Sequence, residues 1–193
     1  MSDQPPTSAP DPQDDDALME AIASGDESAL RRLMERWQGP IYRFIRRTVR
    51  DEDMAEDLTQ ETFWRLWRGR QGYLAGGRFS TWLFRIAARL CLDHFRHGRR
   101  RPREVGDAAL PAAMAPPRDA ADLNARLGEL HGALQVALDR LPANQRAALM
   151  LHRFEGMSYK EIAASLDCSL GAVEQLIYRA RRRLREDLQE FLE

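Results

Sequence analysis

A stretch rich in proline, alanine and arginine divides this chain, and the sequence on both sides of it has the spacing of amphipathic helices. The stretch, residues 99–122, opens with a cluster of arginines and has no sustained apolar periodicity, which is typical of linkers. No strand-like alternation competes with the helical periods elsewhere. The sequence therefore predicts an all-α protein, in which two small helical modules are joined by a flexible linker.

The acidic start of the chain is predicted to lie outside both modules. Residues 1–20 carry six acidic side chains, no basic side chain and four prolines. Such a segment buries too little apolar surface to fold. We therefore expect residues 1–15 to be a disordered acidic tail, residues 16–98 to be the first module and residues 123–193 to be the second.

The composition also argues against catalysis. A chain of 193 residues with 44% hydrophobic and 31% charged residues suits one or two small domains rather than a large enzyme. His94 and His97 could touch one metal from one helix, but no third ligand is evident, so we expect no metal and no cofactor. The sequence contains neither a nucleophile elbow nor a phosphate-binding loop. We expect a protein that is not an enzyme.

Charge and hydropathy bear on location and partners. No apolar run approaches the 18 residues that a membrane span needs, and the start of the chain does not resemble a secretory signal. A cytoplasmic protein without membrane insertion of its own is expected. The formal net charge is −1, so any surface that binds nucleic acid must be local.

Residues 159–178 have the pattern of a helix-turn-helix. Ser158 and Ser169 are placed to cap its two short helices. Asp167 stands at the turn, where a left-handed backbone is needed and aspartate is tolerated. Apolar and small residues fill the positions where the helices cross: Ile162, Ala163, Leu166, Cys168, Val173 and Leu176. The plainer alternative is a helical hairpin with a solvated, charged end.

The second helix of this motif would place its N-terminal end in the major groove of DNA. Its outward side chains are the candidate duplex-binding residues: Glu174, Gln175, Tyr178, Arg179 and Arg182. Residues 179–185 include five arginines, which suit phosphate contacts.

A second candidate DNA surface lies on the helix predicted over residues 81–97. Its exposed stripe and the glycine-rich loop before it combine basic and aromatic residues: Tyr73, Phe79, Arg85, Arg89 and Arg96. Aromatic side chains beside arginines suit single-stranded DNA, whose bases leave the stack. Phe79 and Trp82 could equally be core residues, and for Trp82 the core is the better interpretation.

The helix predicted over residues 52–68 mixes acidic and aromatic side chains on one face. The candidates for contact with a protein partner are Glu56, Asp57, Gln60, Glu61 and Phe63. A solvated helix face does not usually carry so many aromatic residues, so a protein partner is indicated. In the alternative, Phe63 and Trp67 pack against their own module.

At this point the chain resembles a known family. Residues 55–63 and 79–87 are similar to region 2 of bacterial RNA polymerase sigma factors of the extracytoplasmic-function group, within the sigma-70 family. Residues 141–146 and 154–163 are similar to region 4 of the same group. The motifs stand in the family's order, and the linker is too short for the middle domain of housekeeping sigma factors.

This resemblance implies an alternative sigma factor that binds core RNA polymerase and directs promoter-specific transcription initiation. Region 2 would dock on the polymerase clamp and melt the −10 element, and region 4 would bind the flap and read the −35 element as duplex. An anti-sigma factor is a further implied partner. The resemblance also carries over to single residues. The clamp-binding helix of the family matches Glu56, Asp57, Gln60 and Glu61, and the loop that captures a flipped −10 base matches the loop before Phe79. The −35 reading face matches Glu174, Gln175, Tyr178 and Arg179.

The chain departs from the family pattern at Glu174 and Gln175, where many members carry a basic residue followed by serine. Glutamate can accept a hydrogen bond from cytosine N4, and glutamine can pair with adenine, so an unusual −35 sequence is expected. The main alternative function is a helix-turn-helix regulator that binds duplex DNA without joining polymerase. The acidic and aromatic helix argues against it, because a repressor needs no such docking surface.

Overall fold

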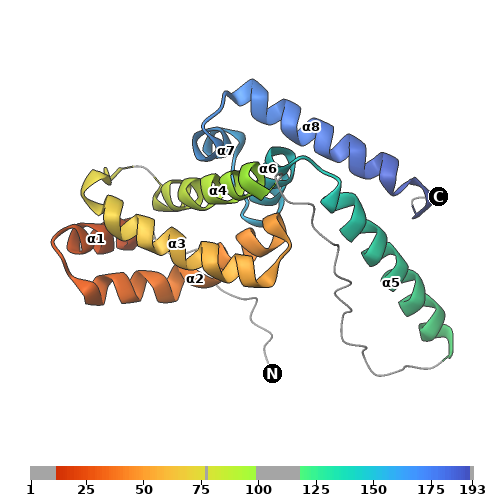
Figure 1. Ribbon diagram of the computed structural model, residues 1–193, viewed down its shortest axis with the longest axis horizontal. Helices are drawn as coiled ribbons and strands as arrows, with labels where there is room; N and C mark the ends of the chain where they lie inside the picture. Colours follow the sequence, from red (N-terminus) through yellow and green to blue (C-terminus); the bar gives the residue numbers. More distant parts are fainter. Residues whose placement is uncertain (1–11, 77, 99–117, 192–193) are drawn as a thin grey trace.

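The computed structural model describes residues 12–76, 78–98 and 118–191, and all the elements in these ranges are helices. The prediction of an all-α fold is confirmed. The first module contains α1 (Pro12–Ala23), α2 (Glu27–Val49), α3 (Glu52–Gly69), the short 3-10 helix η1 (Arg70–Gly72) and α4 (Phe79–Gly98). The second contains α5 (Arg118–Asp139), α6 (Ala143–Phe154), α7 (Tyr159–Leu166), α8 (Leu170–Asp187) and the 3-10 helix η2 (Gln189–Phe191) (Figure 1).

The expected capping residues begin two helices of the helix-turn-helix. Ser158 and Glu161 form a capping box at the start of α7, in which each side chain accepts from the other residue's backbone N–H. The Ser169 side chain accepts from the backbone N–H of Ala172 at 3.2 Å and starts α8. These side chains satisfy backbone donors that the first helical turn leaves unpaired.

The predicted boundary of the acidic tail is wrong for its last residues. Helix α1 begins at Pro12, and the Asp15 side chain is buried. Its carboxylate accepts from the indole Nε1 of Trp37 at 3.1 Å and pairs with the Arg36 guanidinium at 2.6 Å. Both partners lie on α2, so an acidic residue that looked solvated anchors α1 to the module. Residues 1–11 of the expected tail lie outside the described residues.

The predicted end of the linker is also wrong. Helix α5 begins at Arg118, inside the expected linker 99–122. Arginine and the alanines that follow are strong helix formers, and they extend the helical pattern that begins at Leu123 towards the N-terminus. The remaining linker residues, 99–117, lie outside the described residues.

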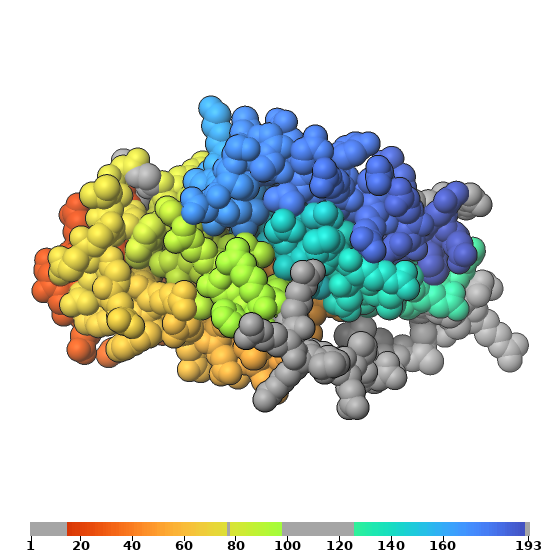
Figure 2. Space-filling view, turned by 45° about the horizontal axis from the view of Figure 1, so that its top comes forward, coloured from red at the N-terminus to blue at the C-terminus, as the bar shows by residue number. Residues whose placement is uncertain are grey.

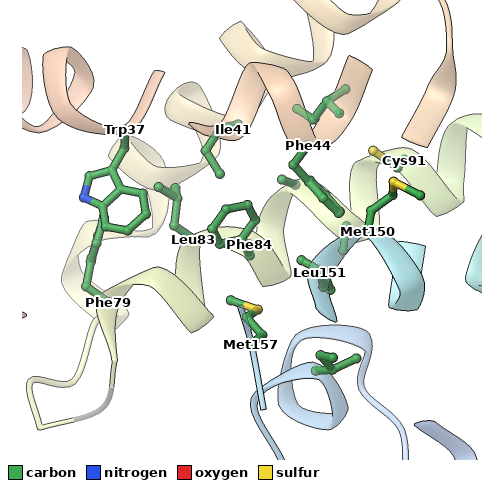
Figure 3. Packing of buried hydrophobic residues seen from close by; sticks show 14 of the residues in the cluster. Trp37, Ile41, Phe44, Phe79, Leu83, Phe84, Cys91, Met150, Leu151 and Met157 are labelled. Atoms are coloured by element: carbon green, nitrogen blue, oxygen red, sulfur yellow. The ribbon is translucent and has the colours of Figure 1, made fainter. Parts of the chain in front are cut away.

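One hydrophobic core runs through both modules. Phe44 of α2 and Phe84 of α4 meet edge to face, with ring centroids 5.4 Å apart. Buried residues of the second module, including Met150, Leu151 and Met157, belong to the same cluster (Figure 3). The apolar faces that the sequence assigned to two modules therefore also pack against each other.

Polar contacts support this packing. The Ser165 hydroxyl on α7 donates to the carbonyl oxygen of Thr81 on α4 at 3.3 Å. Ion pairs also cross between the modules, among them Arg47 with Glu155 at 3.8 Å, Arg50 with Asp139 at 2.8 Å and Arg78 with Glu161 at 2.8 Å. Helix α7 consequently lies along α4, and α8 lies on the outer side of the second module (Figures 1 and 2).

Candidate nucleic-acid and protein interfaces

The turn between α7 and α8 has the geometry that the sequence predicts. Asp167 has φ 55° and ψ 50°, in the left-handed region. The backbone N–H of the next residue, Cys168, donates to the carbonyl of Ala163 at 3.0 Å and closes the turn. Val173 and Ile177 are buried beneath α8, which fixes the face that this helix turns outward.

All five candidate duplex-binding residues are exposed on α8: Glu174, Gln175, Tyr178, Arg179 and Arg182. Their spacing along the helix places them on one stripe. The Tyr178 side chain is 61% exposed, and the Arg182 guanidinium pairs with Glu186 at 3.3 Å. The helix thus presents two groups that can read base edges at its N-terminal half and cations further along.

The arginines of α4 do not all face solvent freely. Arg89 pairs with the Asp167 carboxylate at 2.8 Å, and Arg85 lies 3.9 Å from the other oxygen of the same carboxylate. Arg96 pairs with Asp93 on its own helix at 3.0 Å. Asp167, in the turn of the helix-turn-helix, therefore pairs with two of the three arginines that were expected to contact the −10 element.

The first turn of α7 approaches the same surface. Burial opposes ionisation of Glu161, but hydrogen bonds from Ser158 and the Arg78 guanidinium outweigh it and hold the pKa of this carboxyl below its usual range. The ionised Glu161 therefore serves the capping box and the contact with the first module together.

The aromatic residues of the glycine-rich loop lie deeper than expected. Phe79 is 1% exposed and packs edge to face on Trp37, with ring centroids 5.7 Å apart. Its assignment to DNA contact is corrected, because burial in the core leaves it no surface to offer. Tyr73 is half-buried between Phe79 and Trp82, and its hydroxyl donates to Asp16. Burial and the neighbouring Asp16 raise the pKa of Tyr73.

Leu74 is a large apolar side chain that this loop exposes, at 84%. Leu74 was not among the candidate residues, although an apolar residue between glycines in a loop, with no helical face to join, is a usable signal. A shallow groove of about 270 Å³ lies nearby between α3 and α4. It is lined by Arg65, Gly69, Trp82, Arg85, Ile86 and Arg89.

The acidic face of α3 is exposed as expected at Glu56, Asp57 and Gln60. The carboxylate of Glu61 is part-exposed and accepts from Arg65 at 2.8 Å. Phe63 is 4% exposed, so its assignment to partner contact is corrected: it packs in the module, as the alternative had it. Trp64, one position further, is 55% exposed and supplies the aromatic surface beside the acids.

Two family models match the chain, and the residues they match agree with its division into two modules. The model for sigma-70 region 2 matches residues 33–101, and the model for sigma-70 region 4 matches residues 131–184. The RNA polymerase sigma-H factor of Pseudomonas aeruginosa is 32% identical over 191 residues, covering 93% of this chain and 96% of that protein. The ECF RNA polymerase sigma-E factor of Haemophilus influenzae is 30% identical over 184 residues, covering 92% of this chain and 97% of that protein.

The chain belongs to the extracytoplasmic-function group of the sigma-70 family. As a sigma factor it acts by binding core RNA polymerase and directing transcription initiation, and it catalyses no reaction of its own. The alternative of a regulator that does not join polymerase is therefore set aside. None of the helices described in this sigma factor is both long and apolar enough to cross a bilayer.

Solved structures show the same arrangement of helices. The structure of CnrH in complex with the cytosolic domain of CnrY aligns with a TM-score of 0.66 and 27% identity, covering 92% of this sigma factor and 98% of that chain. The sigma factor RpoE in complex with the anti-sigma factor NepR, from Bartonella quintana, aligns with a TM-score of 0.63 and 26% identity, covering 82% and 96%.

Proposed function

We propose that α8 reads the −35 element of the promoter as duplex DNA. The observation that supports this most directly is the exposed stripe on α8, with Glu174 and Gln175 towards the N-terminal end that follows the turn. Glu174 would accept from a cytosine N4 and Gln175 would pair with an adenine, while Arg179 and Arg182 contact phosphates. Tyr178 adds an exposed ring to the same face.

The first module, α1 to α4, would bind the −10 element after its strands separate. Tyr73 and the exposed Leu74 lie in the loop before α4, and Arg85, Arg89 and Arg96 follow along that helix. Aromatic and apolar side chains beside cations suit unstacked bases and their phosphates. Because Asp167 pairs with Arg85 and Arg89, promoter binding at α4 and the described contact with α7 exclude each other, so the modules separate on promoter binding.

Docking on the polymerase clamp is assigned to α3. Glu56, Asp57, Gln60 and Glu61 offer hydrogen-bond acceptors and negative charge, and Trp64 offers apolar surface beside them. Charges at the rim of an interface steer association, whereas an aromatic side chain at its centre holds the complex. The second module, α5 to α8, would bind the polymerase flap.

An anti-sigma factor is a further proposed partner, since CnrH and RpoE were solved with CnrY and NepR bound. A partner of this class would hold the sigma factor away from polymerase. We place the protein in the cytoplasm, where core polymerase and promoter DNA are found.

Selection of duplex sequences tests the assignment of α8. The variant Glu174→Lys should change which −35 sequences the holoenzyme prefers, because one correct base contact contributes about 1–3 kcal/mol of discrimination. The matched variant Arg182→Ala should weaken all sequences alike and flatten the dependence of affinity on salt. Unchanged sequence preference with Glu174→Lys would contradict the assignment.

A further inference from the structure

The loop between α3 and α4 is tied to α1 at three points. The Gln71 amide Nε2 donates to the carbonyl of Ala23 at 2.7 Å. The Tyr73 hydroxyl donates to one carboxylate oxygen of Asp16, and the backbone N–H of Gly76 donates to the other at 3.3 Å. A single carboxylate therefore binds both ends of the segment 73–76.

The geometry of this segment depends on that carboxylate. Gly76 has φ +100°, a backbone conformation that glycine adopts without strain, and it turns its N–H towards Asp16. Tyr73 packs edge to face on Trp82 with ring centroids 5.2 Å apart, so its hydroxyl is directed from the core side towards α1. With both ends held, Leu74 stands out between them at 84% exposure.

Asp15 fixes the place of Asp16. The Asp15 side chain is 2% exposed and bonds to Trp37 and Arg36 on α2, so the first turns of α1 cannot shift without breaking a buried contact. Its neighbour Asp16 points to the loop instead. The two adjacent acids therefore have different roles: Asp15 anchors α1 to α2, and Asp16 holds the loop.

We propose that Asp16 is a positioning residue for promoter opening, because it holds the loop 73–76 in the shape that presents Leu74 to an unstacked base of the −10 element. This inference rests on the proposed function of the first module. A hydrogen bond to an ionised carboxylate is stronger than one between neutral groups, so one side chain can keep a short glycine-containing loop in a single conformation. An open site that is already ordered binds a flipped base without the entropy cost of ordering the loop.

The test compares holoenzymes carrying Asp16→Ala, Asp16→Asn, Tyr73→Phe and the control Glu20→Ala, which removes an exposed acid from the same helix. Transcript starts made by the unmodified holoenzyme first define the −10 sequence. Permanganate reactivity of its thymines then measures opening, and core binding and −35 duplex binding are measured beside it. Asp16→Ala should reduce opening by about tenfold, as expected for the loss of hydrogen bonds to a charged group, with both other measurements unchanged. Asp16→Asn keeps an acceptor oxygen and should retain part of the opening.

Comparison of the opening measured for these variants distinguishes the possible outcomes. If Asp16 acts through Tyr73, the double variant Asp16→Ala with Tyr73→Phe should open no less than Asp16→Ala alone. Normal opening by Asp16→Ala, or an equal loss in Glu20→Ala, would overturn the inference. The inference would also be overturned if Asp16→Ala and Tyr73→Phe lost core binding and −35 binding to the same extent as opening, because such a uniform loss indicates general unfolding. Failure of the unmodified holoenzyme to initiate at any promoter would instead count against the proposed function.

Discussion

At the scale of the residue, burial decides which acidic and aromatic side chains are available to a partner. Asp15 and Phe63 looked like surface groups in the sequence, and both are buried. Asp15 is tolerated inside because Trp37 and Arg36 satisfy its carboxylate, in keeping with the rule that buried charges are paired. Neither contact follows from local sequence, because each joins residues on different helices.

Removal of the Asp15 carboxylate should destabilise the fold. In Asp15→Ala the buried indole N–H of Trp37 loses its acceptor, and the part-exposed Arg36 guanidinium loses its ion pair with Asp15. Leaving the buried Trp37 donor without an acceptor costs about 1–3 kcal/mol, so the midpoint of chemical unfolding should fall accordingly. Glu20→Ala, an exposed change on the same helix, is the control. An unchanged midpoint for Asp15→Ala would show that this pair adds nothing to stability.

At the scale of the element, helix boundaries followed from the sequence where a local side chain sets them. Ser158 and Ser169 cap as predicted, and Asp167 takes the left-handed conformation. Boundaries were wrong where packing overrides the local signal. The helix predicted over residues 81–97 begins earlier, as α4, at the buried Phe79. Proline inside a helix usually breaks or kinks it, yet α2 continues through Pro40 over the shared core.

The capping box of α7 should make the stability of the fold depend on pH. The folded-state pKa of Glu161 is lowered, so its contribution is fully present above the unfolded value of about 4.5 and is lost as pH falls towards the folded value. Thermal melts of the unmodified chain and Glu161→Gln should therefore differ near pH 7 and converge as the pH is lowered below about 4.5. A difference in melting temperature between the two proteins that stays constant or grows as the pH is lowered would contradict this account.

At the scale of the whole molecule, the sequence predicted two helical modules and the residues that face outward on α3 and α8. It did not predict that the modules share one core or that Asp167 pairs with Arg89. Apolar periodicity marks a face as buried but does not say which helix covers it. Leu151 and Met157 fit a core of the second module alone equally well, and the structure shows them in a cluster with Phe84 of the first.

The contact between modules should compete with DNA. Asp167→Asn removes the charge that holds Arg85 and Arg89, and asparagine tolerates the left-handed turn, so the helix-turn-helix should be preserved. Binding of single-stranded −10 DNA by the full chain should tighten by up to about fivefold, because an exposed ion pair contributes under about 1 kcal/mol. Asp187→Asn, at the far end of α8, is the control for the change in net charge. Equal affinity in the two variants would show that α7 does not mask α4.

The most direct test of the account is run-off transcription by bacterial core polymerase with this sigma factor, made either unmodified or as Asp57→Arg with Glu61→Arg. Both acids lie on the solvent side of α3, so the double variant should fold normally and retain −35 duplex binding through α8. We predict promoter-dependent transcripts with the unmodified chain, and loss of both transcripts and core binding with the variant. A folded variant that binds core polymerase and initiates as well as the unmodified chain would contradict the assignment of α3 as the docking surface.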